Sequence, residues 1–276
     1  MTWNEMPEEE IPPLSGAGYL RAFLRGLPLA LLVLLCLVVL LIMRAVEAPL
    51  FGVRRPLTPY ITRFVCRTGL RVLGIRLKVT GKPMSQLGGV VANHASWLDI
   101  FSLNASDTLY FVSKAEVAKW PGIGLLARSV GTVFIRRDPN DAAQQKSLFE
   151  QRLKAGHKLL FFPEGTSSDG RRVLPFKSTL FAAFFADELR QVSFIQPVSV
   201  SYIAPEGQSL RFYGWWGDMD FAPHLIQTLG AAKQGRIEVV YHPALKVSDY
   251  PDRKALARAC EEAVRSGLNP KVLSET

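Results

Sequence analysis

Residues 89–99 read Gly-Val-Val-Ala-Asn-His-Ala-Ser-Trp-Leu-Asp, and no other stretch of the chain carries as much information. The apolar run at its start predicts a buried strand, and a helix is expected at Trp97–Asn104 with Ser96 as its N-cap. His94 ends the strand and Asp99 falls in the first helical turn, so we expect the carboxylate to hydrogen-bond the imidazole. One ring nitrogen is then held as a donor, and the other is free to accept a substrate proton. From spacing alone, a capped helix with an incidental histidine is an equally good alternative.

From Leu77 onward, short apolar runs alternate with helical patterns. The predicted strands are Val90–Ala92, Leu109–Val112, Thr132–Ile135, Lys158–Phe162, Phe194–Val200 and Ile237–Tyr241. Further helices are predicted at Ala142–Lys154, Thr179–Phe185 and Asp252–Ser266, with shorter turns around Ala115–Trp120 and Ile123–Val130. This alternation predicts an α/β domain with a mixed, largely parallel sheet flanked by helices. Ligands of such sheets bind outside the carboxyl ends of the strands, where His94, Arg136 and Glu164 are expected.

The loop after the fourth predicted strand is rich in hydrogen-bond donors. It reads Phe-Pro-Glu-Gly-Thr-Ser-Ser at 162–168. Gly165 lets a ligand approach the backbone closely, and the hydroxyl of Thr166 can donate to a phosphate oxygen. Lys177 lies at the start of the next predicted helix, where an anion gains from both the charge and the helix dipole. Two successive turns without a ligand are the structural alternative.

Arg136 ends the predicted strand in Gly-Thr-Val-Phe-Ile-Arg at 131–136. A guanidinium at this sheet edge suits bidentate recognition of a phosphate or carboxylate. A solvated arginine at a strand end is the simpler interpretation when the residue is taken alone.

The N-terminal region predicts attachment to a membrane. Leu27–Met43 is an uninterrupted apolar run of 17 residues, and as a helix it is about 25 Å long, slightly short of the hydrocarbon core. The net charge of +9 is concentrated just after it, with nine Lys or Arg and one acid between Arg44 and Lys82. By the positive-inside rule this places the main body in the cytoplasm. A cleaved signal peptide is disfavoured by the Glu-Glu-Glu run at 8–10 in the leader and by Pro49 after the weak cleavage pattern.

A second membrane signal lies in Thr58–Leu73. Arg63, Arg67 and Arg71 recur at four-residue spacing, and apolar residues fall largely on another face of the expected helix. A basic amphipathic helix is typical of an interfacial segment whose arginines meet lipid headgroups. An ordinary surface helix packed on the domain is the alternative.

These signals divide the chain into a leader at 1–26, a membrane helix at 27–48, a basic interfacial segment at 49–76 and a catalytic domain at 77–276. An anionic membrane explains the basic segment better than nucleic acid does, because the apolar run adjoins it. The three cysteines are scattered without metal-ligand spacing, which fits a reducing compartment and predicts no metal site.

Four blocks taken together resemble the membrane-associated lysophospholipid acyltransferases, the group that includes bacterial lysophosphatidate acyltransferases. The blocks are Asn-His-x-Ser-x-x-Asp at 93–99, Gly-Thr-Val-Phe-Ile-Arg at 131–136, Phe-Pro-Glu-Gly-Thr at 162–166 and Ile-Gln-Pro-Val-Ser-Val at 195–200. Their order and spacing also match, and the resemblance covers roughly residues 78–244. One block alone is a weak signal, whereas four in order are highly specific.

The resemblance implies a glycerolipid acyltransferase-like fold and a bacterial inner-membrane enzyme with its catalytic domain in the cytoplasm. His94 is then the general base and Asp99 its orienter, and the acyl donor is a thioester of coenzyme A or acyl carrier protein, with no other cofactor. The residues expected to bind the lysolipid headgroup are Arg136, Glu164, Gly165, Thr166 and Lys177.

The acceptor is left open between lysophosphatidate and lyso-ornithine lipid, a choice that includes activity on both. Arg136 and the hydroxyl-rich loop favour a phosphate, whereas Glu164, Asp218 and Asp220 suit an ornithine amine. A membrane-anchored lipid hydrolase is the second enzyme class, although the chain has no Gly-x-Ser-x-Gly nucleophile motif. A non-catalytic membrane protein that binds anionic lipid is the third alternative. Whether residues 27–43 cross the bilayer or insert into one leaflet is also left open.

Overall fold

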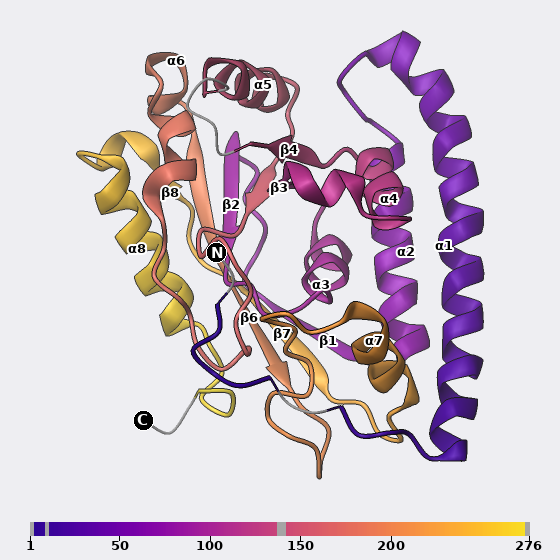
Figure 1. Ribbon diagram of the computed structural model, residues 1–276. Helices are drawn as coiled ribbons and strands as arrows, with labels where there is room; N and C mark the ends of the chain where they lie inside the picture. The colour runs from indigo at the N-terminus through magenta and orange to yellow at the C-terminus, as the bar shows by residue number, and fades with distance from the viewer. Residues whose placement is uncertain (1–2, 9–10, 137–141, 274–276) are drawn as a thin grey trace.

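The computed structural model describes residues 3–8, 11–136 and 142–273. Its described part forms an eight-stranded sheet with the order β1-β7-β6-β2-β5-β3-β4, and β8 pairs with β6 (Figure 1). The strands are β1 Arg76–Thr80, β2 Gly88–Ala92, β3 Tyr110–Lys114, β4 Val133–Ile135, β5 Leu159–Phe161, β6 Phe194–Ile203, β7 Arg236–Tyr241 and β8 Leu245–Lys246.

The central strands run parallel. β2 pairs in parallel with β5 and β6, and β3 pairs in parallel with β5 and β4, whereas β7 and β8 run antiparallel to β6. β1 is parallel to β7 and so shares its reversed direction. The predicted mixed, largely parallel sheet is confirmed. The carboxyl ends of β2, β3, β4, β5 and β6 therefore meet at one edge.

Successive residues of β2 face opposite sides of the sheet, as the pleat requires. Val90 and Ala92 belong to a core cluster that includes side chains from the helices α1, α2, α3 and α7. Val91 lies between them and belongs to the cluster on the other face, with α5, α6, α8 and the 3-10 helix η3. The bounds are α1 Gly16–Phe51, α2 Thr58–Leu73, α3 Asp99–Ser106, α5 Ala142–Lys154, η3 Ser178–Phe185, α6 Asp187–Arg190, α7 Phe221–Gly230 and α8 Arg253–Ser266.

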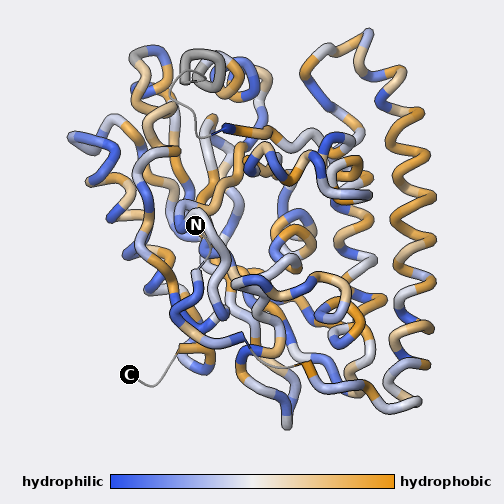
Figure 2. The backbone as a smooth tube through the Cα atoms, in the orientation of Figure 1, coloured by the Kyte–Doolittle hydropathy of each residue, from blue (hydrophilic) through white to orange (hydrophobic). Residues whose placement is uncertain are grey.

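α1 lies lengthwise beside α2 and α7 (Figure 1). Its N-terminal half is tied to the end of α7, because Arg21 Nε donates to the Gly230 carbonyl and Arg25 donates to the carbonyls of Leu229 and Ala231. The helix is long and apolar enough to cross a membrane. Figure 2 shows its apolar colour along most of its length, and its outward residues are exposed, among them Leu24, Leu31, Leu35, Val38, Ile42 and Leu50.

α2 packs between α1 and α3, and two of its three regularly spaced arginines donate to backbone carbonyls of α3. Arg63 Nη2 donates to the Ser106 carbonyl at 2.8 Å, and Arg67 Nε donates to the Ala105 carbonyl at 2.7 Å. Both therefore satisfy carbonyls at the C-terminal end of α3, where cations are favoured. These two side chains therefore cap α3, while Arg67 and Arg71 are also exposed and their role on lipid headgroups stays a prediction.

Several predicted boundaries differ from the structure. Ser96 is not the N-cap of α3, which begins at Asp99, because residues 96–98 form a preceding turn in which the Ser96 carbonyl accepts from the Asp99 amide. The turns predicted around 115–120 and 123–130 are the 3-10 helix η1, Ala115–Lys119, and the α-helix α4, Ile123–Val130. β1 and α7 had not been predicted, since β1 is largely exposed and α7 follows an aromatic loop.

Candidate active site

His94 follows β2, and its imidazole meets the carboxylate of Asp99 as the five-residue spacing predicts. His94 Nδ1 lies 2.6 Å from Asp99 Oδ2. The imidazole keeps 25% of its surface exposed, whereas the aspartate side chain is fully buried. With Nδ1 donating to the carboxylate, Nε2 is the ring nitrogen that can accept a proton.

The Asp99 carboxylate is held by three further donors. Oδ2 accepts from the backbone amides of Ala95 and Ser96 at 3.0 and 3.1 Å, and Oδ1 accepts from the hydroxyl of Tyr202 at 2.5 Å. Burial and the nearby aspartate raise the pKa of Tyr202 well above its usual value, so the hydroxyl stays protonated and donates. A carboxylate with this many charge-assisted bonds is fixed in place before substrate arrives.

The loop after β5 clamps the backbone of His94 from both sides. Glu164 Oε1 accepts from the His94 amide at 2.8 Å, and the Ser168 amide donates to the His94 carbonyl at 2.9 Å. Glu164 Oε2 accepts from the Leu174 amide at 3.0 Å, which ties the end of the same loop to the carboxylate. The conformation of the imidazole-bearing segment is thus set by a loop 70 residues away in sequence.

Glu164 is 1% exposed, and both of its oxygens are engaged by backbone amides. Burial, followed by the proximity of Asp99, raises the pKa of Glu164 well above its ordinary value. The side chain points into the protein, away from the exposed side of the loop. In this position the side chain braces the backbone of the His94 segment.

Phe162, the residue after β5, stacks on the imidazole. The ring centroids of His94 and Phe162 are 4.1 Å apart with an interplanar angle of 11°. One face of the imidazole is therefore covered, and the ring is held in the plane that its bond to Asp99 requires.

Asn93 extends the sheet beyond the last residue of β2. Its side-chain amide donates to the Val200 carbonyl at 2.9 Å and its oxygen accepts from the Val200 amide at 2.8 Å. β6 continues past the Ala92–Val198 pairing as far as Ile203, and this extension carries Tyr202 to the level of Asp99.

The other predicted site residues lie at or beside the same sheet edge. Arg136 follows β4, two strands from β5, and is exposed. The Lys177 amide donates to the Pro163 carbonyl at 2.9 Å, and its exposed side chain precedes η3. Gly165 has φ 75°, a conformation that favours glycine, and it turns the chain between Glu164 and Thr166.

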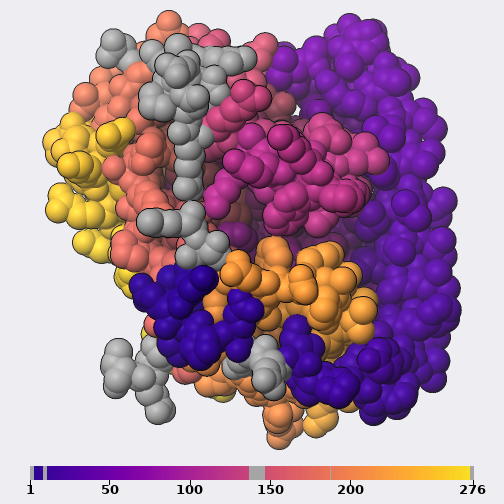
Figure 3. All heavy atoms as spheres, in the orientation of Figure 1, coloured from indigo at the N-terminus to yellow at the C-terminus, as the bar shows by residue number. Residues whose placement is uncertain are grey.

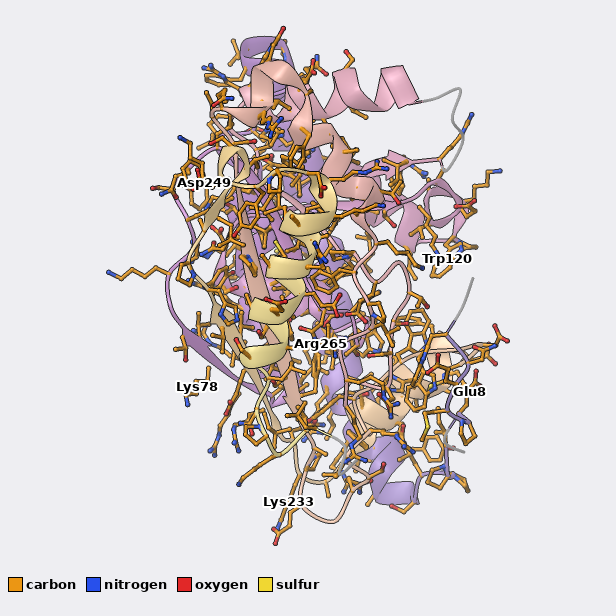
Figure 4. The ribbon with its side chains drawn as sticks, turned by 90° about the vertical axis from the view of Figure 1, so that its left-hand side faces the viewer. Glu8, Lys78, Trp120, Lys233, Asp249 and Arg265 are labelled. Carbon is orange, nitrogen blue, oxygen red and sulfur yellow. The ribbon has the colours of Figure 1, made fainter. Side chains whose placement is uncertain are left out.

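Residues 3–8 cross in front of this loop. The Trp3 amide donates to Thr166 Oγ1 at 3.3 Å, and the Trp216 indole donates to the Met6 carbonyl at 3.4 Å. Glu8 accepts from the backbone amide of Asp218 in the loop before α7. Figure 3 shows a hollow bordered by this segment in indigo, by α7 in orange and by α4 in magenta. Figure 4 places Glu8 and Trp120 on the same side of the molecule, and Lys78 on the opposite side.

His224, on α7, is part of an aromatic cluster beside the His94 segment. The Trp97 indole donates to His224 Nδ1 at 2.9 Å, and the Trp97 ring meets Phe221 edge to face at 5.6 Å. Burial lowers the pKa of His224 to about 4, so the imidazole is neutral at physiological pH. The residue packs the loop 215–220 against the site and is not a second base.

Among the described residues, no group of three or more His, Cys, Asp or Glu is arranged to hold a metal ion. The polar groups of the site instead hold the His94 imidazole in a fixed orientation, in which it can accept a proton. Tyr202 and Phe162 were missed by sequence reasoning. The contact of Tyr202 with Asp99 depends on the register of β6 against β2, which the sequence does not reveal. The position of Phe162 directly before the Pro-Glu-Gly turn could have indicated that its ring lies at the site.

The sequence and structure match known proteins. A family model described as Acyltransferase matches residues 76–201. A lyso-ornithine lipid O-acyltransferase of Rhodobacter capsulatus is 57% identical over 268 residues, which cover 97% of this chain and 96% of that protein. A protein of the same name from Brucella abortus is 36% identical over 80% of this chain and 85% of its own length.

More distant matches carry another name. A 1-acyl-sn-glycerol-3-phosphate acyltransferase of Neisseria gonorrhoeae is 30% identical over 71% of this chain and 76% of its own length. The crystal structure of the 1-acyl-sn-glycerophosphate acyltransferase of Thermotoga maritima superimposes with a TM-score of 0.55 at 22% identity, over 88% of this chain and 95% of that one. This similarity shows a shared fold.

Proposed function

The chain belongs to the acyltransferase family, whose members here acylate lysolipids in lipid biosynthesis, and we propose that its acceptor is a lyso-ornithine lipid. The observation that carries the catalytic assignment is the His94–Asp99 pair, with Nδ1 bound at 2.6 Å and a quarter of the imidazole surface exposed. The acceptor assignment is supported by the 57% identical relative.

His94 Nε2 takes the proton from the free hydroxyl of the lysolipid as that oxygen attacks the thioester carbonyl of the acyl donor. An oxygen–carbon bond forms, the carbon–sulfur bond breaks, and the leaving thiolate takes the proton from the imidazolium. A thiolate is a good leaving group, so no covalent enzyme intermediate is required. General base catalysis of this kind contributes roughly a hundred- to ten-thousand-fold in rate. The thioester of coenzyme A or acyl carrier protein is a co-substrate, and the family needs no separate cofactor.

For the acceptor headgroup we propose Arg136, Lys177, Gly165 and Thr166, which lie at or beside the carboxyl edge of the sheet. Their chemistry suits an anion, with two cations, a glycine that exposes backbone and a hydroxyl. Glu164 is proposed as a positioning residue for His94, because its oxygens are bound to backbone amides.

An ornithine headgroup carries a carboxylate and an amine, whereas lysophosphatidate carries a phosphate. The cations of the site accommodate either anion and so do not discriminate. The amine distinguishes the two acceptors, and the acidic groups Glu8, Asp218 and Asp220 lie at the rim where residues 3–8 meet the loop before α7. This rim supports the choice of an amine-bearing acceptor.

We propose that α1 inserts into one leaflet of the cytoplasmic membrane, with the catalytic domain on the cytoplasmic side. Arg21 and Arg25 tie the start of α1 to α7, and at its far end Glu47 accepts from the amides of Leu57 and Thr58. A helix bound to the domain at both ends cannot cross the bilayer unless the domain enters it as well. Its outward apolar face, together with the surrounding basic residues, suits the surface of an anionic leaflet.

The division of the chain into 1–26, 27–48, 49–76 and 77–276 is retained as a proposal. α1 begins inside the first of these segments, so the helical anchor is longer than the apolar run alone. α2 lies inside the third segment and shares its core with the catalytic domain.

The direct test offers purified full-length protein a labelled acyl thioester with lyso-ornithine lipid or lysophosphatidate in parallel. We expect acylation of lyso-ornithine lipid, and we expect His94→Ala to abolish it while membrane binding persists. His242→Gln is the matched control, because this second histidine binds Ser199 away from the proposed base. Unchanged transfer by His94→Ala contradicts the mechanism. Transfer to lysophosphatidate alone contradicts the proposed acceptor.

A further inference from the structure

A second group of buried charged side chains lies at the amino edge of the sheet, opposite the His94 site. His157 lies two residues before β5, Tyr110 opens β3, and Gly131 lies two residues before β4. Arg152, near the end of α5, and Arg55, in the connector between α1 and α2, meet at this edge. In Figure 1 the connector, α4 and α5 lie at the same end of the molecule.

The two guanidinium groups converge on the end of α4. Arg55 Nη1 donates to the Ser129 carbonyl at 2.7 Å, and Arg152 Nη2 donates to the Gly131 carbonyl. A Cβ at Gly131 would come within 2.9 Å of Arg55 Cζ and 3.2 Å of Arg152 Nη2, so both groups lie against the same residue. Capping of the helix C-terminus explains these two bonds.

Helix capping does not explain the remaining nitrogens. Within the part of the chain that the structure describes, Arg55 Nε, Arg152 Nε and both ring nitrogens of His157 are buried without a hydrogen-bond partner. Arg152 is 9% exposed and His157 is 4% exposed. Buried donors in native proteins are normally satisfied, so the two guanidinium Nε atoms and the one N–H of the imidazole indicate a missing acceptor.

The charge of the cluster has one sign. Arg152 lies over the Tyr110 ring at 4.8 Å from its centroid, and His157 stacks on the same ring at 4.0 Å. Burial and the neighbouring arginines lower the pKa of His157 to about 3, and burial lowers that of Arg152 to about 10. At neutral pH the arginine is therefore charged, and the histidine is neutral with one N–H to donate.

Glu47 is a carboxylate near Arg55, but its oxygens are already bound. Oε1 accepts from the amides of Leu57 and Thr58, and Oε2 accepts from the Thr58 hydroxyl and from Arg44. It serves the start of α2 and does not reach the unpartnered nitrogens as an acceptor. Neutralisation of the two arginines must come from elsewhere.

We infer that Arg55, Arg152 and His157 form a binding site for a phosphate group. Two guanidinium nitrogens and an imidazole N–H match an oxyanion that accepts from several directions, and guanidinium is well suited to phosphate. Arg44, the first cation after the apolar run of α1, donates to the Gly52 and Arg54 carbonyls of the same connector. This position suits the headgroup phosphate of a membrane lipid, and free inorganic phosphate offers the same chemistry.

The site is separate from acyl transfer. It lies at the opposite ends of strands that are three to five residues long, and it uses none of the residues assigned to His94 or to the acceptor. A bound phosphate would join the α1–α2 connector to α4 and α5. The predicted effect is thus on the stability of the membrane-proximal part of the protein.

The test measures thermal unfolding of the full-length protein in a phosphate-free maltoside detergent. One arm adds inorganic phosphate at constant ionic strength, and another adds phosphatidylglycerol, with a glucosyl diacylglycerol as the neutral lipid control. Saturating ligand is expected to raise the wild-type midpoint by roughly 5 °C. Arg152→Met should abolish this rise, whereas Arg54→Met, an exposed arginine of the same connector, should keep it.

His157→Phe is the second variant, because a phenyl ring preserves the stack on Tyr110 while removing both nitrogens. Loss of the ligand-dependent shift in this variant supports the site even if Arg152→Met fails to fold. A response to both ligands indicates recognition of the phosphate alone, and a response limited to phosphatidylglycerol indicates a lipid site. The inference is overturned if neither ligand shifts the wild type, or if His157→Phe responds as the wild type does.

Discussion

The buried charged groups at the two edges of the same sheet differ in their hydrogen-bond partners. At the carboxyl edge Asp99 has four hydrogen-bond donors and Glu164 has two, all from within the chain. At the amino edge Arg152 and His157 are also buried but retain unpartnered nitrogens. The imidazole of His94 is therefore oriented by a carboxylate whose partners are already in place, whereas the amino edge holds the donors on which the inferred phosphate site rests.

The edges are also separated in space. A strand of five residues is about 16 Å long, so a ligand at the amino edge does not touch the imidazole. Perturbing one edge should therefore change catalysis and perturbing the other should change stability. Four substitutions put this separation to the test.

Asp99→Asn should have the largest effect. An asparagine in this position has only one acceptor oxygen. If that oxygen accepts from the imidazole and the two backbone amides, the NH2 group must face the remaining donor, the hydroxyl of Tyr202. We expect kcat/KM to fall by about 10³- to 10⁴-fold, as for other imidazoles that lose a carboxylate orienter. Asp107→Asn, which removes a partly buried carboxylate paired with Lys158, should stay within about twofold. Comparable losses in both variants would mean that the effect is structural.

Glu164→Gln should lower kcat by about a hundredfold with little change in the KM for the acceptor. One of the two amides of His94 and Leu174 would face an NH2 group, so the clamp on the His94 backbone would open. Steady-state kinetics separate the two constants. Glu261→Gln is the control, since that carboxylate accepts from the Phe176 amide in the same part of the fold. A raised KM with unchanged kcat would instead indicate contact with the headgroup.

Tyr202→Phe should reduce kcat by roughly tenfold, because the Asp99 carboxylate loses one of the four donors that fix its orientation toward His94. Tyr241→Phe is the matched control, because that buried hydroxyl binds Ser106. Steady-state kinetics of the two variants check this expectation, and equal losses in both would argue for a packing role only.

Without added phosphate or lipid, His157→Phe should have the smallest effect, which we expect on stability in mild acid. The pKa of His157 in the folded protein is lowered to about 3 by burial and the arginines, whereas the unfolded chain protonates near 6.5. The unfolded state therefore binds more protons below pH 6.5, and the free energy of unfolding falls by up to about 1.4 kcal/mol per pH unit.

Denaturant unfolding of both proteins at pH 7.5 and pH 5.5 checks this expectation. The wild type should lose more stability than His157→Phe across this interval, by up to about 1 kcal/mol. Parallel losses in the two proteins would show that His157 does not titrate as its burial requires.

The sequence predicted the elements that depend on local pattern. The mixed sheet is confirmed, and so is the contact of His94 with Asp99, because five residues across a strand end and a turn leave little freedom. The acyltransferase class is confirmed by the family match and the relatives. Local spacing carries these conclusions because each depends on residues close together in the chain.

What the sequence could not predict depends on distant register and on side-chain direction. Tyr202 reaches Asp99 because β6 runs past β2, and no local pattern records that extension. Glu164 looked like a headgroup ligand in an exposed loop, yet its carboxylate turns inward. The sequence pattern predicted that Arg63 faces lipid headgroups, but its side chain donates to a carbonyl at the end of α3. Residues 3–8 lack periodicity, so their position over Thr166 was not foreseeable.

The docking of α1 against α7 has a consequence for the order of synthesis. The ribosome makes the apolar helix first, but its protein partners at Leu229, Gly230 and Ala231 follow only about 200 residues later. At roughly 5–20 residues per second the helix waits about 10 to 40 seconds for them. During that interval the nascent chain exposes its most apolar segment, and the lipid surface is the partner available to shield it.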